Sequence, residues 1–388
     1  MTRHPSHIQN NRRGAVAVLA CFLMIALLAM LAFAIDLGYL ANSQAELQRS
    51  ADAAALAACY ELVYQGTPGT PVNLSTNVLN VPTVAGQYAA LNHVCGSAPS
   101  LATGDVVVGY MADPTQPGGT IDTSANQNGF NAVQVTVRRS SSENGKVPSF
   151  FGRVFGSQGE STSASAIAAL LNNFGGFQAP STNGGNTNLM ILPYALDQLT
   201  WNALQAGDTT VTTDVWNYNT SGQVVSGSDG IREVNLFPQG TGSPGNRGTV
   251  YIGNAKGTAD LVQQILYGIS PSDLAVYGGQ LKFDSSGNLY LSAKPGISAG
   301  TKSALASIIG QTRLIPIFAS LTGNGANASY DIVMFVGIRV MDVNLTGSMS
   351  SKHLTVQPAL VYTRGGIPST SSSTRQSYGA YSPVWLAR

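Results

Sequence analysis

The spacing of apolar residues predicts a membrane-spanning helix near the start of the chain. A charge-free apolar run extends from Ala15 to Ile35. At about 1.5 Å per residue, a helix of this length covers roughly 31 Å, which matches the hydrocarbon core of a bilayer. The run therefore predicts one span, marked at every fourth position by Ala15, Leu19, Leu23, Leu27, Leu31 and Ile35.

The helical pattern continues beyond the apolar run. Small and apolar residues recur at spacings of three and four, and no proline occurs from residue 15 to residue 64. We expect one continuous helix over 14–65, with Asp36 and Asp52 as polar positions on it. Its second half presents a packing seam made of Leu40, Leu47, Ala51, Ala54 and Ala58. The element that packs there is either a partner protein or the chain's own domain.

The charges that flank the span predict its orientation. Arg3, Arg12 and Arg13 precede it, whereas acidic residues outnumber the single arginine just after it. Because the positive flank of a span stays in the cytoplasm, residues 1–13 form a cytoplasmic tail and the bulk lies outside the cytoplasmic (inner) membrane. A cleaved secretory signal is the alternative, since Ala32-Phe-Ala34 fits a cleavage pattern, but the apolar part of such signals spans only about 7–15 residues.

The remainder of the chain is predicted to be a mixed α+β, β-rich body. Period-two alternation predicts strands at 105–110 and 131–138, the second with its valines facing inward. A short helix is expected at 84–92 after a loop at 66–82, and an amphipathic helix at 148–155 should cover the sheet with its aromatic side chains. Residues 161–171 fit either a strand or a last segment of small residues, because their period is ambiguous.

Further elements follow a glycine-rich stretch. Helices are expected at 189–206, 260–267 and 302–309, and the expected strands are 210–218, 231–237, 249–252, 314–321, 330–344 and 353–362. The predicted domains are a first extracytoplasmic region at 66–171, a linker at 172–188, a second α+β domain at 189–363 and a flexible C-terminal tail at 364–388.

Four stretches carry a resemblance to a known family. They are Arg12-Arg13-Gly14-Ala15 with Asp36-Leu-Gly-Tyr39 around the span, the alanine-rich run from Leu47 to Ala57, Val147-Pro-Ser-Phe-Phe-Gly-Arg-Val-Phe-Gly156, and the small-residue tract from Ser161 to Ala169. Together they resemble the N-terminal part of the TadE/TadG-like proteins of Flp-type (Tad) pilus assembly. The resemblance covers about the first 170 residues and implies a part in building or anchoring a pilus.

The sequence departs from this family pattern at two places. Members processed as pseudopilins are cut after the glycine and carry a glutamate at the fifth mature position, where this chain has Leu19. Some TadG-like members hold a metal in an Asp-x-Ser-x-Ser motif, but the nearest match here begins with Asn344 and is followed by a strand-like segment. We therefore expect no metal site.

Composition limits the partners and the redox chemistry. Charged residues make up 10% of the chain, hydrophobic ones 44%, and the net charge is +1. Without a cluster of lysine and arginine, nucleic acid is excluded as a partner. Cys21 lies inside the span, whereas Cys59 and Cys95 lie beyond it, where they form either one disulfide or two buried thiols.

Motifs for catalysis are weak. Gly240-Thr-Gly242-Ser-Pro-Gly245 matches a dinucleotide fingerprint as a string, but no helix is expected after it. His93 and His353 are isolated, and no Gly-x-Ser-x-Gly elbow accompanies them. The acidic residues appear scattered over turns, and Asp331, Arg339 and Asp342 fit a structural ion pair. We expect no catalytic residue and no cofactor.

These observations favour a non-enzymatic, single-pass membrane protein. The expected role is a structural or assembly component of a Flp/Tad-type pilus or a related secretion apparatus, with the lipid bilayer and other pilus or envelope subunits as partners. The alternative is a ligand-binding or adhesion module on a membrane anchor, which would use loops such as 239–248 or 323–328.

Overall fold

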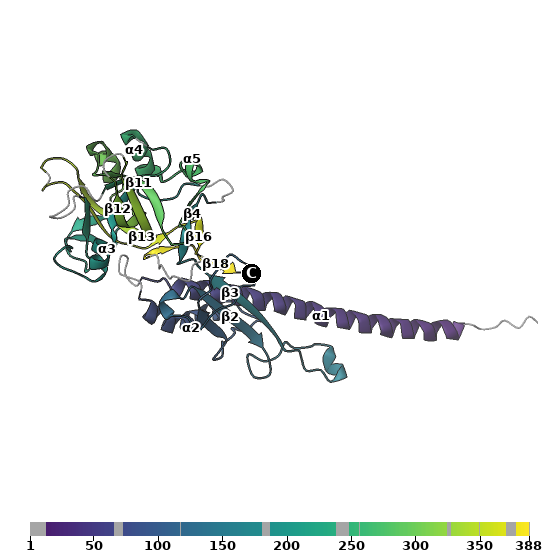
Figure 1. Cartoon of the computed structure of the whole chain (residues 1–388). Coiled ribbons are helices and arrows are strands. Elements are labelled where there is room, and N and C mark those ends of the chain that lie inside the picture. The colour runs from purple at the N-terminus through teal and green to yellow at the C-terminus, as the bar shows by residue number, and fades with distance from the viewer. Residues whose placement is uncertain are drawn as a thin grey trace, which may run out of the picture. The chain divides into compact units, whose positions relative to one another are not determined.

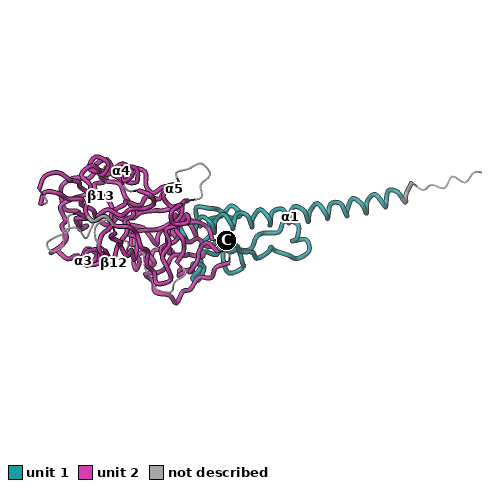
Figure 2. Tube along the Cα trace, turned by 45° about the horizontal axis from the view of Figure 1, so that its top comes forward, with its two compact units in different colours: residues 1–54, 85–106, 135–166 teal, residues 55–84, 107–134, 167–388 magenta. Residues whose placement is uncertain are grey.

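The computed structural model describes residues 13–65, 73–116, 118–180, 187–237, 248–255, 257–323, 327–348, 350–369 and 378–387. Within it the chain forms two compact units, coloured separately in Figure 2. The first unit contains residues 1–54, 85–106 and 135–166, and the second contains the rest. The architecture is mixed α+β, as the sequence predicts.

The longest element is the N-terminal helix α1 (Arg13–Glu61), which is continuous over 49 residues (Figure 1). At about 1.5 Å per residue it is roughly 73 Å long, more than twice the thickness of a hydrocarbon core. The side chains of Val16 to Ile35 are almost all exposed, while many beyond Ser43 are buried. We call 15–35 the apolar half of α1 and 37–61 its packed half.

The second helix, α2 (Leu74–Leu91), begins ten residues before the expected position. Asn73 caps its start by accepting a hydrogen bond from the Thr76 backbone N–H at 3.1 Å. Pro82 lies inside the helix, although proline removes a backbone donor and usually ends a helix. The prediction of a loop up to this proline was therefore wrong for residues 74–82.

A four-stranded sheet follows, with strand order β1-β2-β3-β18. Its strands are β1 (Val106–Gly109), β2 (Ala132–Arg139), β3 (Thr162–Ala169) and β18 (Trp385–Ala387). Short 3-10 turns, η1 (Gln127–Gly129) and η2 (Gly152–Phe155), lie in the connections before β2 and β3. The three valines of β2, Val133, Val135 and Val137, are fully buried, as their alternation predicts.

The larger sheet has seven strands in the order β11-β9-β5-β12-β13-β14-β8. They are β5 (Tyr194–Asp197), β8 (Val234–Phe237), β9 (Gly248–Tyr251), β11 (Leu289–Pro295), β12 (Thr312–Thr322), β13 (Ser329–Asn344) and β14 (His353–Pro358). Successive residues of β13 enter different cores, Phe335 on one face and Val336 on the other. Burial on both faces explains why this strand reads as a continuous apolar run.

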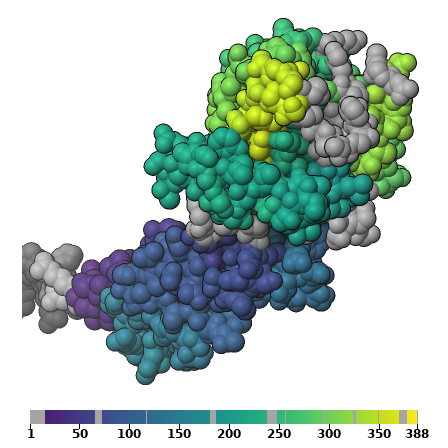
Figure 3. Space-filling model, turned by 90° about the vertical axis from the view of Figure 1, so that its left-hand side faces the viewer, coloured from purple at the N-terminus to yellow at the C-terminus, as the bar shows by residue number. Residues whose placement is uncertain are grey.

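Helices and a smaller sheet supply the two cores. One core contains residues of α3 (Gln198–Gln205), α4 (Thr258–Tyr267) and α6 (Lys302–Ala306). In the space-filling view of Figure 3, the part of the chain around residue 200 is coloured teal. The other contains residues of α5 (Pro271–Leu274), β4 (Phe174–Gln178) and β10 (Gln280–Lys282). Strand β4 pairs with β10 and with β16 (Gly366–Pro368). The remaining pairs are β6 (Trp216–Tyr218) with β7 (Val224–Ser226), and β15 (Val361–Tyr362) with β17 (Ala380–Tyr381).

Three further stretches differ from their predicted structure. The expected linker 172–188 begins with β4, because Phe174 and Phe177 are buried and the Phe177 ring lies 5.0 Å from that of Phe335. The expected helix 189–206 is β5 followed by the shorter α3, which Asp197 caps. The expected flexible tail contributes β16, β17 and β18, so its described residues are hydrogen-bonded into sheets.

Candidate functional site

The residue that follows the apolar run, Asp36, holds a turn of the chain that is more than a hundred positions away. Its carboxylate accepts hydrogen bonds from the backbone N–H groups of Phe150 at 2.8 Å and of Gly152 at 2.8 Å. The Phe151 N–H lies 3.1 and 3.3 Å from the two carboxylate oxygens, and the Ser149 hydroxyl donates at 3.2 Å. Three consecutive amides that converge on one anion form the kind of site normally found at a helix N-terminus.

The turn is shaped for this close approach. A Cβ added at Gly152 would lie 2.6 Å from the Ser149 hydroxyl oxygen, so no other residue fits without a shift. Gly156 ends the 3-10 turn η2 with a φ of +88°, a left-handed conformation that favours glycine. At the base of the loop, Val147 and Glu160 exchange two backbone hydrogen bonds of 2.9 Å. The glycines of this motif thus serve one compact turn.

Aromatic side chains on this turn do not cover the sheet, and the prediction that they would do so was wrong. Phe150 is 55% exposed, Phe151 42% and Phe155 84%. Only Phe150 has a ring partner among the described residues, the edge-to-face ring of Tyr39 at 5.0 Å. An amphipathic pattern predicts that one face of an element is apolar, but it does not predict what covers that face.

Two glutamines bind the packed half of α1 to strand β3. Gln44 donates a hydrogen bond to the Ser163 carbonyl at 2.9 Å, and Gln48 donates to the Ser165 carbonyl at 3.4 Å. Carbonyls two residues apart on a strand are about 6.6 Å apart, and side chains four residues apart on a helix are separated by about 6 Å. The i, i+4 spacing of the glutamines therefore matches the spacing of the two β3 carbonyls. This match was not predicted from the sequence.

The predicted packing seam lies within the chain's own fold. Leu47, Ala51, Ala54 and Ala58 are fully buried, whereas Leu40 is half-buried. Between them on the helix, the Ser50 hydroxyl donates to the Ala89 carbonyl of α2 at 3.1 Å. The chain's own domain, one of the two alternatives, covers these four residues, whereas Leu40 keeps part of its side chain exposed.

The predicted disulfide is absent, because Cys59 and Cys95 are both free thiols. Cys59 is fully buried with its sulfur 3.8 Å from the Asn131 carbonyl, and burial raises the pKa of its thiol. The Cys95 thiol donates to the Ser43 hydroxyl at 3.1 Å, and its backbone N–H donates to the Glu46 carboxylate at 2.7 Å. Each cysteine has a partner of its own, and Cys95 helps to hold the turn after α2 against α1.

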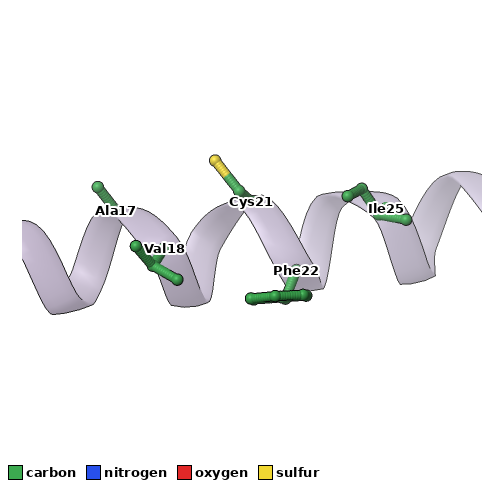
Figure 4. A pocket seen from close by; sticks show the side chains of 5 residues that line it. All are labelled: Ala17, Val18, Cys21, Phe22 and Ile25. Carbon is green, nitrogen blue, oxygen red and sulfur yellow. The ribbon is translucent and has the colours of Figure 1, made fainter.

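In the apolar half of α1, the side chains point outward from an unaccompanied helix. The exposed fractions are 61% for Leu19, 56% for Leu23, 61% for Leu27, 57% for Leu31 and 45% for Ile35; the side chain of Ala15 is not described. A shallow hollow there is lined by Ala17, Val18, Cys21, Phe22 and Ile25, all from α1 itself (Figure 4). A hollow on one face of one helix is a surface feature and not a ligand cavity. The helix is long and apolar enough to cross a membrane.

The structure gathers three acidic residues that the sequence analysis treated as scattered. Carboxylate oxygens of Asp214, Asp229 and Glu233 lie within 4.8 Å of one another. Glu233 is buried, which raises its pKa, although the N–H groups of Val215 and Trp216 donate to it and oppose the rise. Asp214 likewise accepts from the backbone N–H groups of the turn at residues 229–230. Because backbone donors bind these carboxylates, the cluster is explained as support for the loop around β6 and β7.

The other candidate polar groups are bound to partners. Asp342 pairs with His353 at 2.6 Å, and the second ring nitrogen of this histidine lies 3.1 Å from the Ser351 carbonyl. Arg339 lies over the ring of Tyr218 at 3.4 Å and donates a hydrogen bond to the Gly310 carbonyl at 2.6 Å, so these contacts of Arg339 are not with Asp342, the aspartate that pairs with His353.

In the motif that begins with Asn344, the side chain of Lys302 lies beside the oxygen atoms that a metal ion would need. Its ammonium group lies 3.4 Å from Asn344 Oδ1 and 3.0 Å from the Thr346 hydroxyl. A metal ion would have to displace this positive charge. The glycine motif at 240–245 and most of the loop at 239–248 lie outside the described residues, as does part of the loop at 323–328.

Comparison with known proteins gives two family matches. Residues 14–60 match the Flp pilus-assembly TadE/G-like family, and residues 41–168 match the Tad-like Flp pilus-assembly family. Neither a curated protein nor a solved structure matches the chain. The matches include Asp36, the packed half of α1 and the turn at 149–152. The matches confirm that the N-terminal segment of this chain resembles the TadE/TadG-like proteins of Flp pilus assembly, through a TadE/G-like part at residues 14–60 and a Tad-like part at residues 41–168.

Proposed function

We propose that this chain is a structural or assembly component of a Flp/Tad-type pilus or a related secretion apparatus, anchored in the membrane by a single helix. The observation that carries the proposal is the extent of the two matches. They include the apolar helix and the helix-on-sheet region that encloses its packed half. A rigid connection between a span and a folded body suits a subunit that must be held at the membrane surface.

The proposed orientation places the N-terminus in the cytoplasm and the bulk outside the cytoplasmic membrane. The basic residues Arg3, Arg12 and Arg13 on one flank of the span support it. The chain is not proposed to be an enzyme. Among the described residues, the groups considered for catalysis include His353, Lys302 and Glu233. Each of these side chains is hydrogen-bonded within the fold.

Crosslinking from exposed positions of the packed half tests the assembly role. A photoreactive amino acid is placed at Ala41, Ala45 or Arg49, which are exposed, and at the exposed Leu199 in α3 as a control. Adducts with another pilus or envelope subunit from the first three positions, together with loss of pili on gene deletion, are expected. Normal piliation after deletion, with no adduct from any position on α1, would contradict the role.

Release from the membrane separates this role from ligand binding. A variant in which a cleavable signal replaces residues up to 36 keeps the packed half of α1, whose buried residues the fold needs. An assembly subunit loses its function when it is released in this way. A binding or adhesion module keeps its activity.

A further inference from the structure

We propose that the turn at residues 149–155 inserts its apolar side chains into the membrane interface beside α1 and thus provides a second contact with the lipid bilayer. The proposal rests on the membrane anchoring of α1 and is independent of any role in a pilus. It assigns a function to the aromatic side chains that the fold leaves exposed.

The first step is the position of the turn. Asp36 is the first polar residue after the apolar half, so it lies at the level where the span leaves the hydrocarbon core. Its carboxylate binds the backbone of Phe150, Phe151 and Gly152 directly. The turn is therefore fixed at the depth of the interface. Figure 1 shows the connection between β2 and β3 running beside α1 toward the apolar half, and Figure 2 shows the same arrangement within the first unit.

The second step is the character of the exposed surface. Within six consecutive residues, Phe150, Phe151, Val154 and Phe155 are 55%, 42%, 80% and 84% exposed. Single exposed apolar residues are normal on soluble proteins, but a contiguous group of them marks an interaction site. Because backbone hydrogen bonds to Asp36 and within the turn fix its conformation, the turn does not depend on burial of these side chains for its shape.

The third step identifies the occupant as lipid. The ring of Phe150 contacts that of Tyr39, which lies one helical turn after Ile35 (45% exposed), so the turn meets α1 directly beyond the end of its apolar half. The lipid that would surround the apolar half, where Phe33 is 66% exposed, is therefore the apolar phase nearest to the turn. Aromatic residues favour the interfacial region, and Arg153 within the same turn can reach the phosphate groups of the lipids.

Quenching of tryptophan fluorescence by brominated lipid tests the proposal on the full chain. The variants are Phe155→Trp on the turn, Phe22→Trp in the span and Leu199→Trp on α3, which are 84%, 68% and 82% exposed in the wild-type chain. Each is reconstituted into vesicles of phosphatidylethanolamine and phosphatidylglycerol, with and without bromine on the acyl chains. The emission of Trp201, Trp216 and Trp385 is subtracted using the wild-type protein.

The three positions separate the possible outcomes. Brominated lipid should reduce the added emission of F155W and F22W by about half or more and leave that of L199W unchanged. Quenching of F22W without quenching of F155W overturns the proposal while the anchor stands, and it would leave a protein partner as the occupant of the turn. Absence of quenching in F22W contradicts the membrane anchor itself.

A second variant tests the role of Asp36 in positioning. Adding Asp36→Ala to F155W removes the acceptor of the backbone hydrogen bonds but leaves the apolar half intact. The quenching of F155W should then decrease, while that of F22W with the same substitution should stay constant. Equal quenching of F155W with and without the carboxylate would show that Asp36 does not hold the turn at the membrane.

Discussion

The two halves of α1 have the same backbone structure and opposite surroundings. In the apolar half, large side chains such as Leu27 and Phe33 are more than 60% exposed. In the packed half, Leu47, Ala51 and Ala54 are fully buried. The helix is continuous through both, so secondary structure alone does not distinguish a span from a core helix.

The difference lies in how each half removes its apolar surface from water. The apolar half carries large side chains on all sides, as expected for a helix surrounded by lipid. The packed half carries alanines on one side and polar groups on the other, which allows a sheet and a second helix to approach closely. Asp36 marks the boundary, and its hydrogen bonds connect this boundary to the turn at 149–152.

The largest expected effect comes from the same substitution made in both halves. Leu47→Ala removes a fully buried side chain and should lower the free energy of local unfolding by about 2–5 kcal/mol. Leu27→Ala should leave the packed half unchanged, because Leu27 contacts no core there. Hydrogen exchange of the amides of residues 40–61, measured on the full chain in vesicles, gives this free energy. Equal effects of the two substitutions would abolish the distinction between the halves.

A smaller effect is expected from overpacking. Ala54→Leu inserts a large side chain into a filled space and should cost about 1–3 kcal/mol, measured by the same exchange. Its control, Ala34→Leu, is on the exposed surface of the apolar half and should have no effect on residues 40–61. If A54L were as stable as the wild type, the packed half would not be enclosed in the way described.

The glutamine contacts should contribute less. Gln44→Ala with Gln48→Ala removes three exposed hydrogen bonds to β3, including the one that Gln44 accepts from the Thr162 hydroxyl, and also the bond from Gln48 to Asp52. Each of these bonds is worth about 0.5–1.5 kcal/mol at most. Exchange of the amides of residues 161–169 should become faster in the double variant. Arg49→Ala on the same helical turn serves as the control, and an identical change in both proteins would show that the glutamines do not secure the strand.

The last prediction concerns the cysteines, and reduction of the protein is expected to leave the number of alkylated sites unchanged. Denatured protein that has never been reduced should be alkylated at Cys21, Cys59 and Cys95, because all three are free thiols. In the folded protein, a hydrophilic maleimide should not reach Cys59, which is fully buried and whose pKa is raised by burial. Intact mass spectrometry gives the number of alkylated sites. Alkylation of only one cysteine before reduction would reveal the disulfide that the structure lacks.

Local patterns made much of this structure predictable. The span, the continuous helix, β2 and the buried strand β13 all follow from the spacing of apolar residues over short distances. The helix around Pro82 did not, because tertiary contacts of α2 override the local preference of proline. Strand β4 was missed because its two glycines resemble a linker, although Phe174 and Phe177 on either side of them indicate burial.

The candidate site was predictable only in parts. The sequence singled out Asp36 and the motif at 147–156 separately, but nothing local connects two segments that are more than a hundred residues apart. The acidic group of Asp214, Asp229 and Glu233 was missed for a different reason, because its members are close in sequence but only the fold of the loop around β6 and β7 brings their carboxylates together. The exposure of Phe155 was predicted wrongly, because side chains that pack in a core, contact a partner protein or enter a membrane all give the same hydrophobic pattern.

The central claim is that residues 15–35 remain in the bilayer as the continuation of a folded helix. Alkaline extraction of membranes, followed by intact mass spectrometry of the protein, tests it most directly. The account predicts that the protein stays in the membrane fraction and that its mass includes the whole apolar half. A soluble protein whose mature chain begins near Ile35 would contradict it.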